Sequence, residues 1–205
     1  MNRREFFKTG LKKASKSLVN AAVNHVRQRA LRWIRPPYAL DELEFLLACT
    51  RCNKCIEACP HHVIFPLPAR LGAQVACTPA MDILNKGCHL CDDWPCVSTC
   101  EPGALSQPEV SGDNVVPLPR IALAEINKNT CLPYNGPECG ACASSCPVPG
   151  TLLWRGERPY INTDTCTGCG LCREACIVQP RAIDIKSVHL PSPRRAAAIS
   201  TTPVA

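Results

Sequence analysis

Sixteen of the seventeen cysteines in this 205-residue chain fall into four groups of four along the sequence. The first group, CTRCNKCIEACP, runs from Cys49 to Pro60 with the spacing C-x2-C-x2-C-x3-C-P. In this spacing, three thiolates bind one [4Fe–4S] cluster and the fourth turns away toward a second cluster. The motif therefore predicts iron–sulfur chemistry and requires a partner motif.

Three further groups of cysteines follow. The last group repeats the first spacing, and Gly168 and Gly170 keep its loop open, so that backbone N–H groups can approach the sulfurs. The two middle groups each widen one gap, to C-x4-C and to C-x7-C. Cys77 is left over, and we expect it to ligate nothing. We expect four [4Fe–4S] clusters, whose ligands are Cys49, Cys52, Cys55, Cys59, Cys88, Cys91, Cys96, Cys100, Cys131, Cys139, Cys142, Cys146, Cys166, Cys169, Cys172 and Cys176.

The crossing of each fourth cysteine predicts how the groups combine. Pairing in sequence order places Cys100 with the first three cysteines of the first group, and Cys59 with those of the second. In the same way, Cys176 joins the first three cysteines of the third group, and Cys146 those of the fourth. The alternative is a nested order, in which the first motif pairs with the last and Cys59 lies beside Cys166.

Other uses of cysteine fit this pattern less well. Disulfide scaffolds do not repeat a three-residue ligand spacing that ends in proline. Structural zinc sites use C-x2-C pairs separated by a longer gap, whereas four thiols within eleven residues suit a cubane. His61 and His62 follow a motif that already has four sulfurs, so we expect them to be solvated or packed against its loop. We expect Trp94 to cover a cluster.

The composition indicates little conventional core, because the chain is 46% hydrophobic with its cysteines counted, 5% aromatic, and contains 20 prolines. We expect metal binding to supply folding free energy, with short elements wrapped around the clusters. The predicted fold class is α+β, with two ferredoxin-like (β-α-β)2 units preceded by a basic N-terminal helix. The predicted divisions are 1–35, 36–112 and 113–190 for the segment and the two units, and 191–205 for a flexible tail.

Local patterns predict the elements that carry the motifs. Residues 41–48 read as a short helix that leads into the first motif. Residues 106–119 are rich in Pro, Ser, Gly, Asp and Asn and read as the loop between the two halves. A turn over 155–158 joins two of the strands. The predicted strands cover 62–67, 81–84, 121–126, 151–154, 160–162 and 182–185.

The basic charge is confined to one end of the chain. Residues 1–35 hold ten Lys or Arg and one acid, Glu5, whereas the remainder holds thirteen basic and sixteen acidic residues. This distribution argues against a nucleic-acid-binding domain. Val19, Val23 and Val26 recur at helical spacing, which predicts either an amphipathic helix on an anionic membrane or partner, or a solvated basic helix. No apolar run is long enough to cross a bilayer.

The start of the chain bears on its location. Arg3 and Arg4, followed by Phe6 and Phe7, look like a twin-arginine export signal, yet lysines and arginines interrupt the apolar stretch that such a signal needs. We expect a cytoplasmic protein that is peripheral at the inner membrane, with periplasmic export as the alternative.

Taken together, these motifs resemble the ferredoxin-type proteins of the NapG/MauM family of periplasmic nitrate reductase and methylamine utilisation, and their shorter cytoplasmic relative. The resemblance covers nearly the whole chain, including the Arg35-Pro36-Pro37 junction, CHLCDDWPCVSTCEPGAL, CLPYNGPEC and CTGCGLCREACIVQPRAI. It implies four [4Fe–4S] clusters and electron passage between a membrane quinol-oxidising partner and a terminal redox enzyme. The interrupted apolar stretch is closer to the cytoplasmic relative, and the second motif is closer to the exported members.

Two functions of different classes follow. The first is a non-catalytic electron-transfer subunit that relays electrons between a membrane quinol-oxidising iron–sulfur protein and a terminal oxidoreductase of the molybdenum-containing kind. The chain has no nucleotide-binding glycine loop, no nucleophile paired with a base, and no open metal position recognisable from spacing, so we expect no catalytic residues. The alternative is a cytoplasmic factor that assists the maturation of an iron–sulfur molybdoenzyme.

Overall fold

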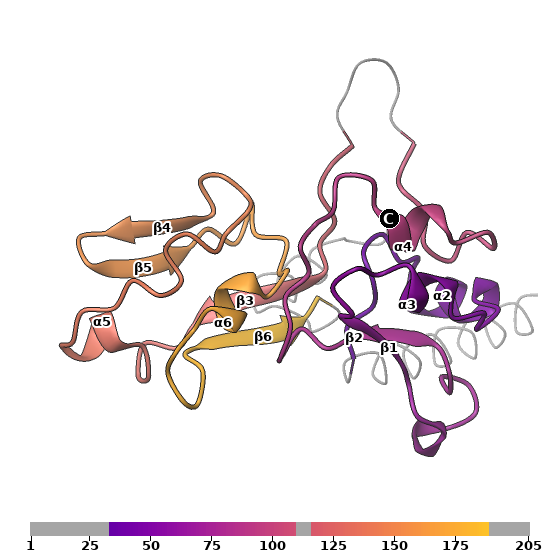
Figure 1. Ribbon diagram of the computed structural model, residues 1–205, viewed down its shortest axis with the longest axis horizontal. Coiled ribbons are helices and arrows are strands. Elements are labelled where there is room, and N and C mark those ends of the chain that lie inside the picture. The colour runs from indigo at the N-terminus through magenta and orange to yellow at the C-terminus, as the bar shows by residue number, and fades with distance from the viewer. Residues whose placement is uncertain (1–32, 110–115, 189–205) are drawn as a thin grey trace, which may run out of the picture.

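The computed structural model describes residues 33–109 and 116–188. Most of the predicted N-terminal helix, part of the loop predicted over 106–119, and the predicted tail lie outside these residues. Figure 1 shows two halves side by side along the longest axis of the molecule. One half carries α2, α3, α4 and the β1–β2 pair, and the other carries α5, α6 and the β3–β6 and β4–β5 pairs.

The first half is built from short elements. Helix α2, predicted over 41–48, is confirmed at Glu42–Ala48. The strand predicted over 62–67 is present in its central part, where β1 pairs antiparallel with β2. An isolated bridge from Ile34 to Met81 adds to this pair, and a second bridge joins Ala39 to Leu105. The remaining elements are α3 at Lys54–Glu57, β1 at Ile64–Pro66, a 3-10 turn at Ala69–Leu71, β2 at Pro79–Met81 and α4 at Pro95–Ser98.

The strand predicted over 81–84 was wrong beyond its first residue, because β2 ends at Met81. Asp82 starts a turn instead. The Asn85 amide donates to both carboxylate oxygens of Asp82, at 2.9 and 3.0 Å, and the backbone N–H groups of Asn85 and Lys86 donate to the Asp82 carbonyl. Side chains of Asp and Asn stabilise turns in this way, so the local hydrogen bonds outweigh the apolar pattern.

The second half has the element order strand, helix, strand, repeated once. The strands predicted in this half are all present, and their ends coincide with the prediction or are displaced by one or two residues. Outer strands β3 and β6 pair antiparallel over five residues, and β4 and β5 form a hairpin with a two-residue loop, Gly156-Glu157. The elements are β3 at Ala122–Ile126, α5 at Leu132–Asn135, β4 at Leu152–Arg155, β5 at Arg158–Ile161, α6 at Leu171–Glu174 and β6 at Ile183–Ser187.

Residues 33–35, which the sequence assigned to the N-terminal segment, pack into the first half. The Arg35 guanidinium donates to both carboxylate oxygens of Glu42, at 2.6 and 2.9 Å, and to Thr78 Oγ1 and the Pro79 carbonyl. The indole N–H of Trp33 also donates to Glu42. Only 4% of the Arg35 side chain and 1% of the Glu42 side chain are exposed, so this ion pair is part of the core.

The two halves meet where residues 83–88 pack on the loop and helix at 169–174. The Cys88 N–H donates to the Cys169 carbonyl at 2.7 Å, and the Gly87 N–H donates to the Glu174 carboxylate at 2.7 Å. A Cβ at Gly87 would lie 2.6 Å from a methyl carbon of Leu171 and 2.8 Å from its Cα, so this contact requires glycine. The backbones of the two halves therefore touch directly beside two motif cysteines.

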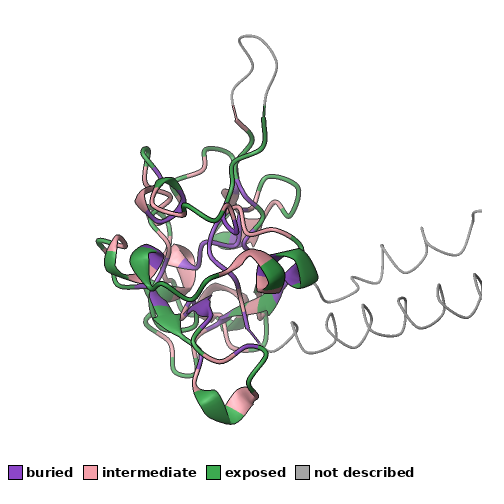
Figure 2. Ribbon diagram, turned by 90° about the vertical axis from the view of Figure 1, so that its right-hand side faces the viewer, coloured by how far each residue is buried: buried purple, intermediate pink, exposed green. Residues whose placement is uncertain are grey.

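Buried residues occur in short stretches along the chain rather than in one continuous layer, as Figure 2 shows. The largest cluster contains Phe45, Ile83 and Trp94 together with the motif cysteines Cys55 and Cys96. Cysteines thus occupy positions that aliphatic side chains fill in an ordinary core. This arrangement agrees with the expectation of little conventional core.

Candidate metal centres

Three of the four cysteine loops share an unusual backbone. In the first motif, Arg51 and Asn53, on either side of Cys52, have φ values of +59° and +63°. Gly168 and Gly170 hold the same positions around Cys169, at +72° and +82°. Left-handed residues between right-handed ones turn successive N–H groups to one side and form an anion-binding concavity. The loops are therefore shaped to hold a group with negative charge.

The second loop uses residues that resist this conformation. Leu90 and Trp94 have φ values of +51° and +44°, where non-glycine residues are strained by about 1–2 kcal/mol each. The wider gap between Cys91 and Cys96 lets Trp94 act as the residue before α4. Such strain is retained where a site demands the geometry.

Four cavities are each lined by four motif cysteines, and we number them by the motif that supplies three of the four. Site 1 is also lined by Phe45 and Pro79 from the first half, and site 2 by Ile64, Met81 and Trp94. The cysteines of site 1 are Cys49, Cys52, Cys55 and Cys100, and those of site 2 are Cys59, Cys88, Cys91 and Cys96.

The second half holds the other two cavities. The β3–β6 and β4–β5 pairs form their walls, through Ala124 and Leu152 at site 4 and through Ile126 and Trp154 at site 3. The cysteines of site 3 are Cys131, Cys139, Cys142 and Cys176, and those of site 4 are Cys146, Cys166, Cys169 and Cys172. The grouping predicted by sequence order is thus confirmed as a spatial arrangement of side chains. The nested order is not adopted, since Cys59 lines site 2.

The four sites follow one another in space in the order 1, 2, 4, 3. Sites 1 and 2 adjoin because α3 and the turn after it connect Cys55 to Cys59. Sites 2 and 4 adjoin through the hydrogen bond between Cys88 and Cys169. Sites 4 and 3 adjoin because α6 carries Cys172 in its first turn and leads to Cys176. The sequence predicted the pairs within each half but not which sites meet between the halves.

Burial raises the pKa of several motif cysteines. It raises the pKa of one thiol or more at sites 1, 2 and 4 to about 12, and that of Cys142 at site 3 to about 11, with neighbouring thiols of the same and of adjacent sites as a further cause. Thiolates can exist there only beside a compensating cation. The groups raised to about 12 belong to Cys55, Cys88, Cys96 and Cys172.

Backbone N–H groups also reach the sulfurs. Leu105, Gly168 and Ala182 donate to the Sγ atoms of Cys100, Cys166 and Cys176, each at 3.4 Å. N–H donors to sulfur stabilise thiolate ligands and their clusters.

The donor set fits [4Fe–4S] clusters better than single ions. Each cavity has four sulfur donors and no carboxylate among its lining residues. In the described part of the chain, no three His, Cys, Asp or Glu side chains converge closely enough to hold one metal ion. Soft thiolates spread around a larger cavity suit a cubane, in which each sulfur binds a different iron.

The remaining sequence predictions concern residues around the sites. Cys77 is exposed and lines none of the four cavities. That Cys77 binds no cluster stays a prediction. Trp94 is buried in the wall of site 2, as predicted for a cover, with an edge contact to Tyr38 at 5.0 Å. His62 is exposed, and His61 packs against the loop of site 2.

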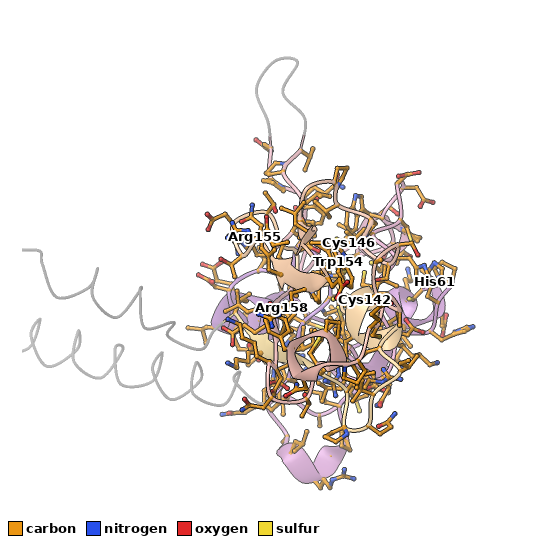
Figure 3. The ribbon with its side chains drawn as sticks, turned by 90° about the vertical axis from the view of Figure 1, so that its left-hand side faces the viewer. His61, Cys142, Cys146, Trp154, Arg155 and Arg158 are labelled. Carbon is orange, nitrogen blue, oxygen red and sulfur yellow. The ribbon has the colours of Figure 1, made fainter. Side chains whose placement is uncertain are left out.

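Two residues near the sites were missed by sequence reasoning. His89 lies inside the second motif and stacks on His61 with ring centroids 3.5 Å apart. Trp154 lies in the wall of site 3, and Figure 3 labels it with Cys142. Because His89 lies between Cys88 and Cys91 in the sequence, its position beside site 2 could have been predicted. Nothing in the local sequence could have indicated that of Trp154, since β4 folds over site 3 from outside both motifs.

Comparison with known proteins adds an independent line of evidence. Residues 123–184, which contain all eight cysteines of sites 3 and 4, match the model of the 4Fe-4S dicluster domain.

Among the described residues, no helix has the length and apolarity that spanning a bilayer requires.

Three curated relatives cover most of the chain. The ferredoxin-type protein NapG of Haemophilus influenzae is 32% identical over 77% of this chain, which spans 60% of that relative's length. The methylamine utilization ferredoxin-type protein MauM of Methylorubrum extorquens is 30% identical over a match that covers 90% of this chain and 88% of MauM's own length. The ferredoxin-type protein NapF of Escherichia coli is 29% identical over a match that covers 79% of this chain and 90% of NapF's own length.

Proposed function

The chain belongs to the NapG/MauM family of ferredoxin-type proteins, and we propose that it relays electrons through four [4Fe–4S] clusters held in sites 1 to 4. It is an iron–sulfur electron-transfer protein rather than an enzyme. The observation that carries the cluster number is the set of four cavities, each lined by four cysteines. A bound [4Fe–4S] cluster supplies a centre that can be reduced and reoxidised.

The arrangement of the sites supports a relay rather than four independent centres. Adjacent sites are joined by short covalent or hydrogen-bonded paths, and the contact between Cys88 and Cys169 links the two halves. Sites 1 and 3 lie at the two ends of this series, and Cys52 of site 1 is exposed. We assign these two ends to the redox partners, which we propose are a membrane quinol-oxidising iron–sulfur protein and a terminal oxidoreductase. We also assign the (β-α-β)2 arrangement of two-cluster ferredoxins to the half from β3 to β6, which the match to the dicluster model supports.

Cluster content is the first test. Protein purified without oxygen should hold about sixteen irons and about sixteen sulfides per chain. Spin counting of the fully reduced protein by electron paramagnetic resonance should then account for four centres. A content near eight irons that stays there after reconstitution with iron and sulfide contradicts the four-cluster proposal.

Electron relay is tested with membranes from a strain that lacks this gene. Quinol supplied to such membranes should reduce the added iron-loaded protein, as followed by cluster bleaching, and the reduced protein should pass electrons to the terminal enzyme. The Cys169→Ser variant should interrupt this passage because site 4 lies between the ends, whereas Cys77→Ser should not. The alternative role, maturation of a molybdoenzyme, predicts instead that the protein binds only the enzyme's precursor and that Cys169→Ser leaves electron passage unchanged.

We further propose a cytoplasmic location at the inner membrane. The support is the charge of residues 1–35, since each basic residue near anionic lipid contributes about 1 kcal/mol before screening. Fractionation of a C-terminally tagged protein, with and without residues 1–32, tests this. A truncated form that stays on the membrane as firmly as the full chain contradicts the anchor, and a shortened form in the periplasm supports twin-arginine export instead.

A further inference from the structure

The indole N–H of Trp154 is a buried donor whose acceptor is absent from the protein. Among the described residues, its Nε1 is the one buried side-chain nitrogen or oxygen without a hydrogen-bond partner. A buried N–H without an acceptor is unfavourable, and tryptophan N–H groups in buried positions usually find one. The position of this nitrogen therefore requires an explanation.

Strand β4 places the Trp154 ring in the wall of site 3. Alternate residues of a strand face the same side, so Leu152 and Trp154 both face the cluster sites, Leu152 at site 4 and Trp154 at site 3. Their cross-strand partners, Ile161 and Pro159, line the same two cavities. The hairpin thus covers one site with an aliphatic pair and the other with a pair that includes an N–H donor.

The wall of site 3 offers few acceptors. Apart from its four cysteines, Trp154 is the one lining residue whose side chain carries a polar atom, and the others are Ile, Leu, Pro, Ala and Val. The backbone carbonyls around the cavity do not accept from Nε1. No cysteine sulfur accepts from Nε1 either, so a sulfide of the bound cluster is the acceptor that remains. Trp154 and Cys142, both labelled in Figure 3, line this cavity together.

We propose that the Trp154 N–H donates a hydrogen bond to a sulfur of the cluster bound in site 3 and raises the reduction potential of that cluster. Hydrogen bonds to cluster and cysteine sulfurs stabilise the more negative, reduced form, and they are one of the means by which proteins set cluster potentials. The inference depends on the proposed function, because it requires a cluster at site 3. It makes Trp154 a residue that adjusts the potential of an end member of the relay.

A direct test detects the indole nitrogen itself. Protein grown with tryptophan labelled with 15N at the indole is purified without oxygen, reduced, and examined by pulsed electron paramagnetic resonance. We expect a hyperfine coupling from one indole nitrogen to a reduced cluster. The chain has two other tryptophans, of which Trp33 donates to Glu42 and lines no site, and Trp94 lines site 2. The coupling should therefore persist in labelled Trp94→Phe protein and disappear in Trp154→Phe protein.

The second readout is the potential. In Trp154→Phe protein, one cluster should show a threefold to tenfold smaller equilibrium constant for reduction, where tenfold corresponds to about 59 mV for one electron. The other three potentials should stay unchanged, and Trp94→Phe is the matched control for the loss of an indole beside a cluster.

Each outcome decides the inference. Labelled Trp94→Phe protein retains Trp154, so absence of any indole coupling in it overturns the proposal even where Trp154→Phe protein loses iron. Unchanged potentials in iron-complete Trp154→Phe protein overturn it as well. A wild-type protein without iron at site 3 contradicts the proposed function instead, and iron analysis separates that failure from the failure of the hydrogen bond.

Discussion

Removal of the Arg35 charge should destabilise the first half severely. In Arg35→Met, the Glu42 carboxylate keeps the Trp33 N–H as a donor but loses both charged hydrogen bonds, at 2.6 and 2.9 Å, while only 1% of its side chain is exposed. Breaking a buried ion pair on one side is unfavourable by about 3–5 kcal/mol, because it leaves a buried charge uncompensated. This is a large share of the about 5–15 kcal/mol that stabilises a typical domain.

The double variant Arg35→Met/Glu42→Leu separates charge from packing. It removes both charges, and it leaves the Trp33 N–H without its acceptor and the Pro79 carbonyl without its donor. Each unpaired buried group lowers the stability by about 1–3 kcal/mol. Part of this loss is offset because no charge remains buried, so the double variant should be more stable than Arg35→Met alone. The effects of the two single changes should therefore not add.

The assay is the rate at which iron-loaded protein bleaches in guanidinium without oxygen, with far-ultraviolet circular dichroism as a second probe. A rate is the appropriate measure because cluster loss makes unfolding irreversible. Lys54→Met is the matched control, since its ion pair with Glu101 is exposed and should contribute little. The reasoning is refuted if the double variant bleaches as fast as the summed effects of Arg35→Met and Glu42→Leu on the bleaching rate predict.

Three further predictions concern the cysteine loops. Gly168→Ala should destabilise the protein by about 2–5 kcal/mol, because its Cβ would lie 2.1 Å from the Ala122 carbonyl oxygen and its φ is +72°. Gly150→Ala is the control, since this glycine has φ +70° but open space around it, and it should lower the stability by only about 1–2 kcal/mol in the same assay. Cys146→Ala should remove or alter the cluster of site 4 and leave site 3 with its four cysteines; a change in the electron paramagnetic resonance signal of site 3 alone contradicts the crossing of the fourth cysteine. Cys77→Ser should keep the full iron and sulfide content of the wild type, and the loss of one cluster's iron assigns Cys77 a ligand role.

The four cysteine motifs and the departure of each fourth cysteine from its own motif could be predicted from the sequence, because both are local properties. A loop with two residues between thiols, followed by one helical turn, directs the last sulfur away from the first three whatever surrounds it. The four quartets and the alternation of strands and helices in the second half follow from such short-range rules. The helix at 42–48 follows equally from its local pattern.

Where local rules conflicted, the sequence was a poorer guide. The segment from Met81 to Leu84 predicts a strand, but the hydrogen bonds of Asp82 with Asn85 form a turn. That turn carries Gly87 into contact with Leu171. The expected boundary at Arg35 differs from the structure for a related reason, because a basic residue next to two prolines resembles a linker until Glu42, seven residues on, folds back to pair with it.

By itself, then, the sequence predicted the kind of ligand and the crossing of each fourth cysteine, since ligand type and spacing act over a few residues, while the cavities decided between the sequential and the nested order. Only the tertiary structure decided that site 2 meets site 4, because that contact joins Cys88 to Cys169, eighty-one residues apart, through a backbone N–H and a backbone carbonyl that no sequence pattern singles out. It also decided which walls contain a hydrogen-bond donor. Trp154 reaches site 3 from a hairpin outside the cysteine motifs, and its N–H is without an acceptor in the protein because the β4–β5 pair folds over a cavity lined by sulfur and apolar groups.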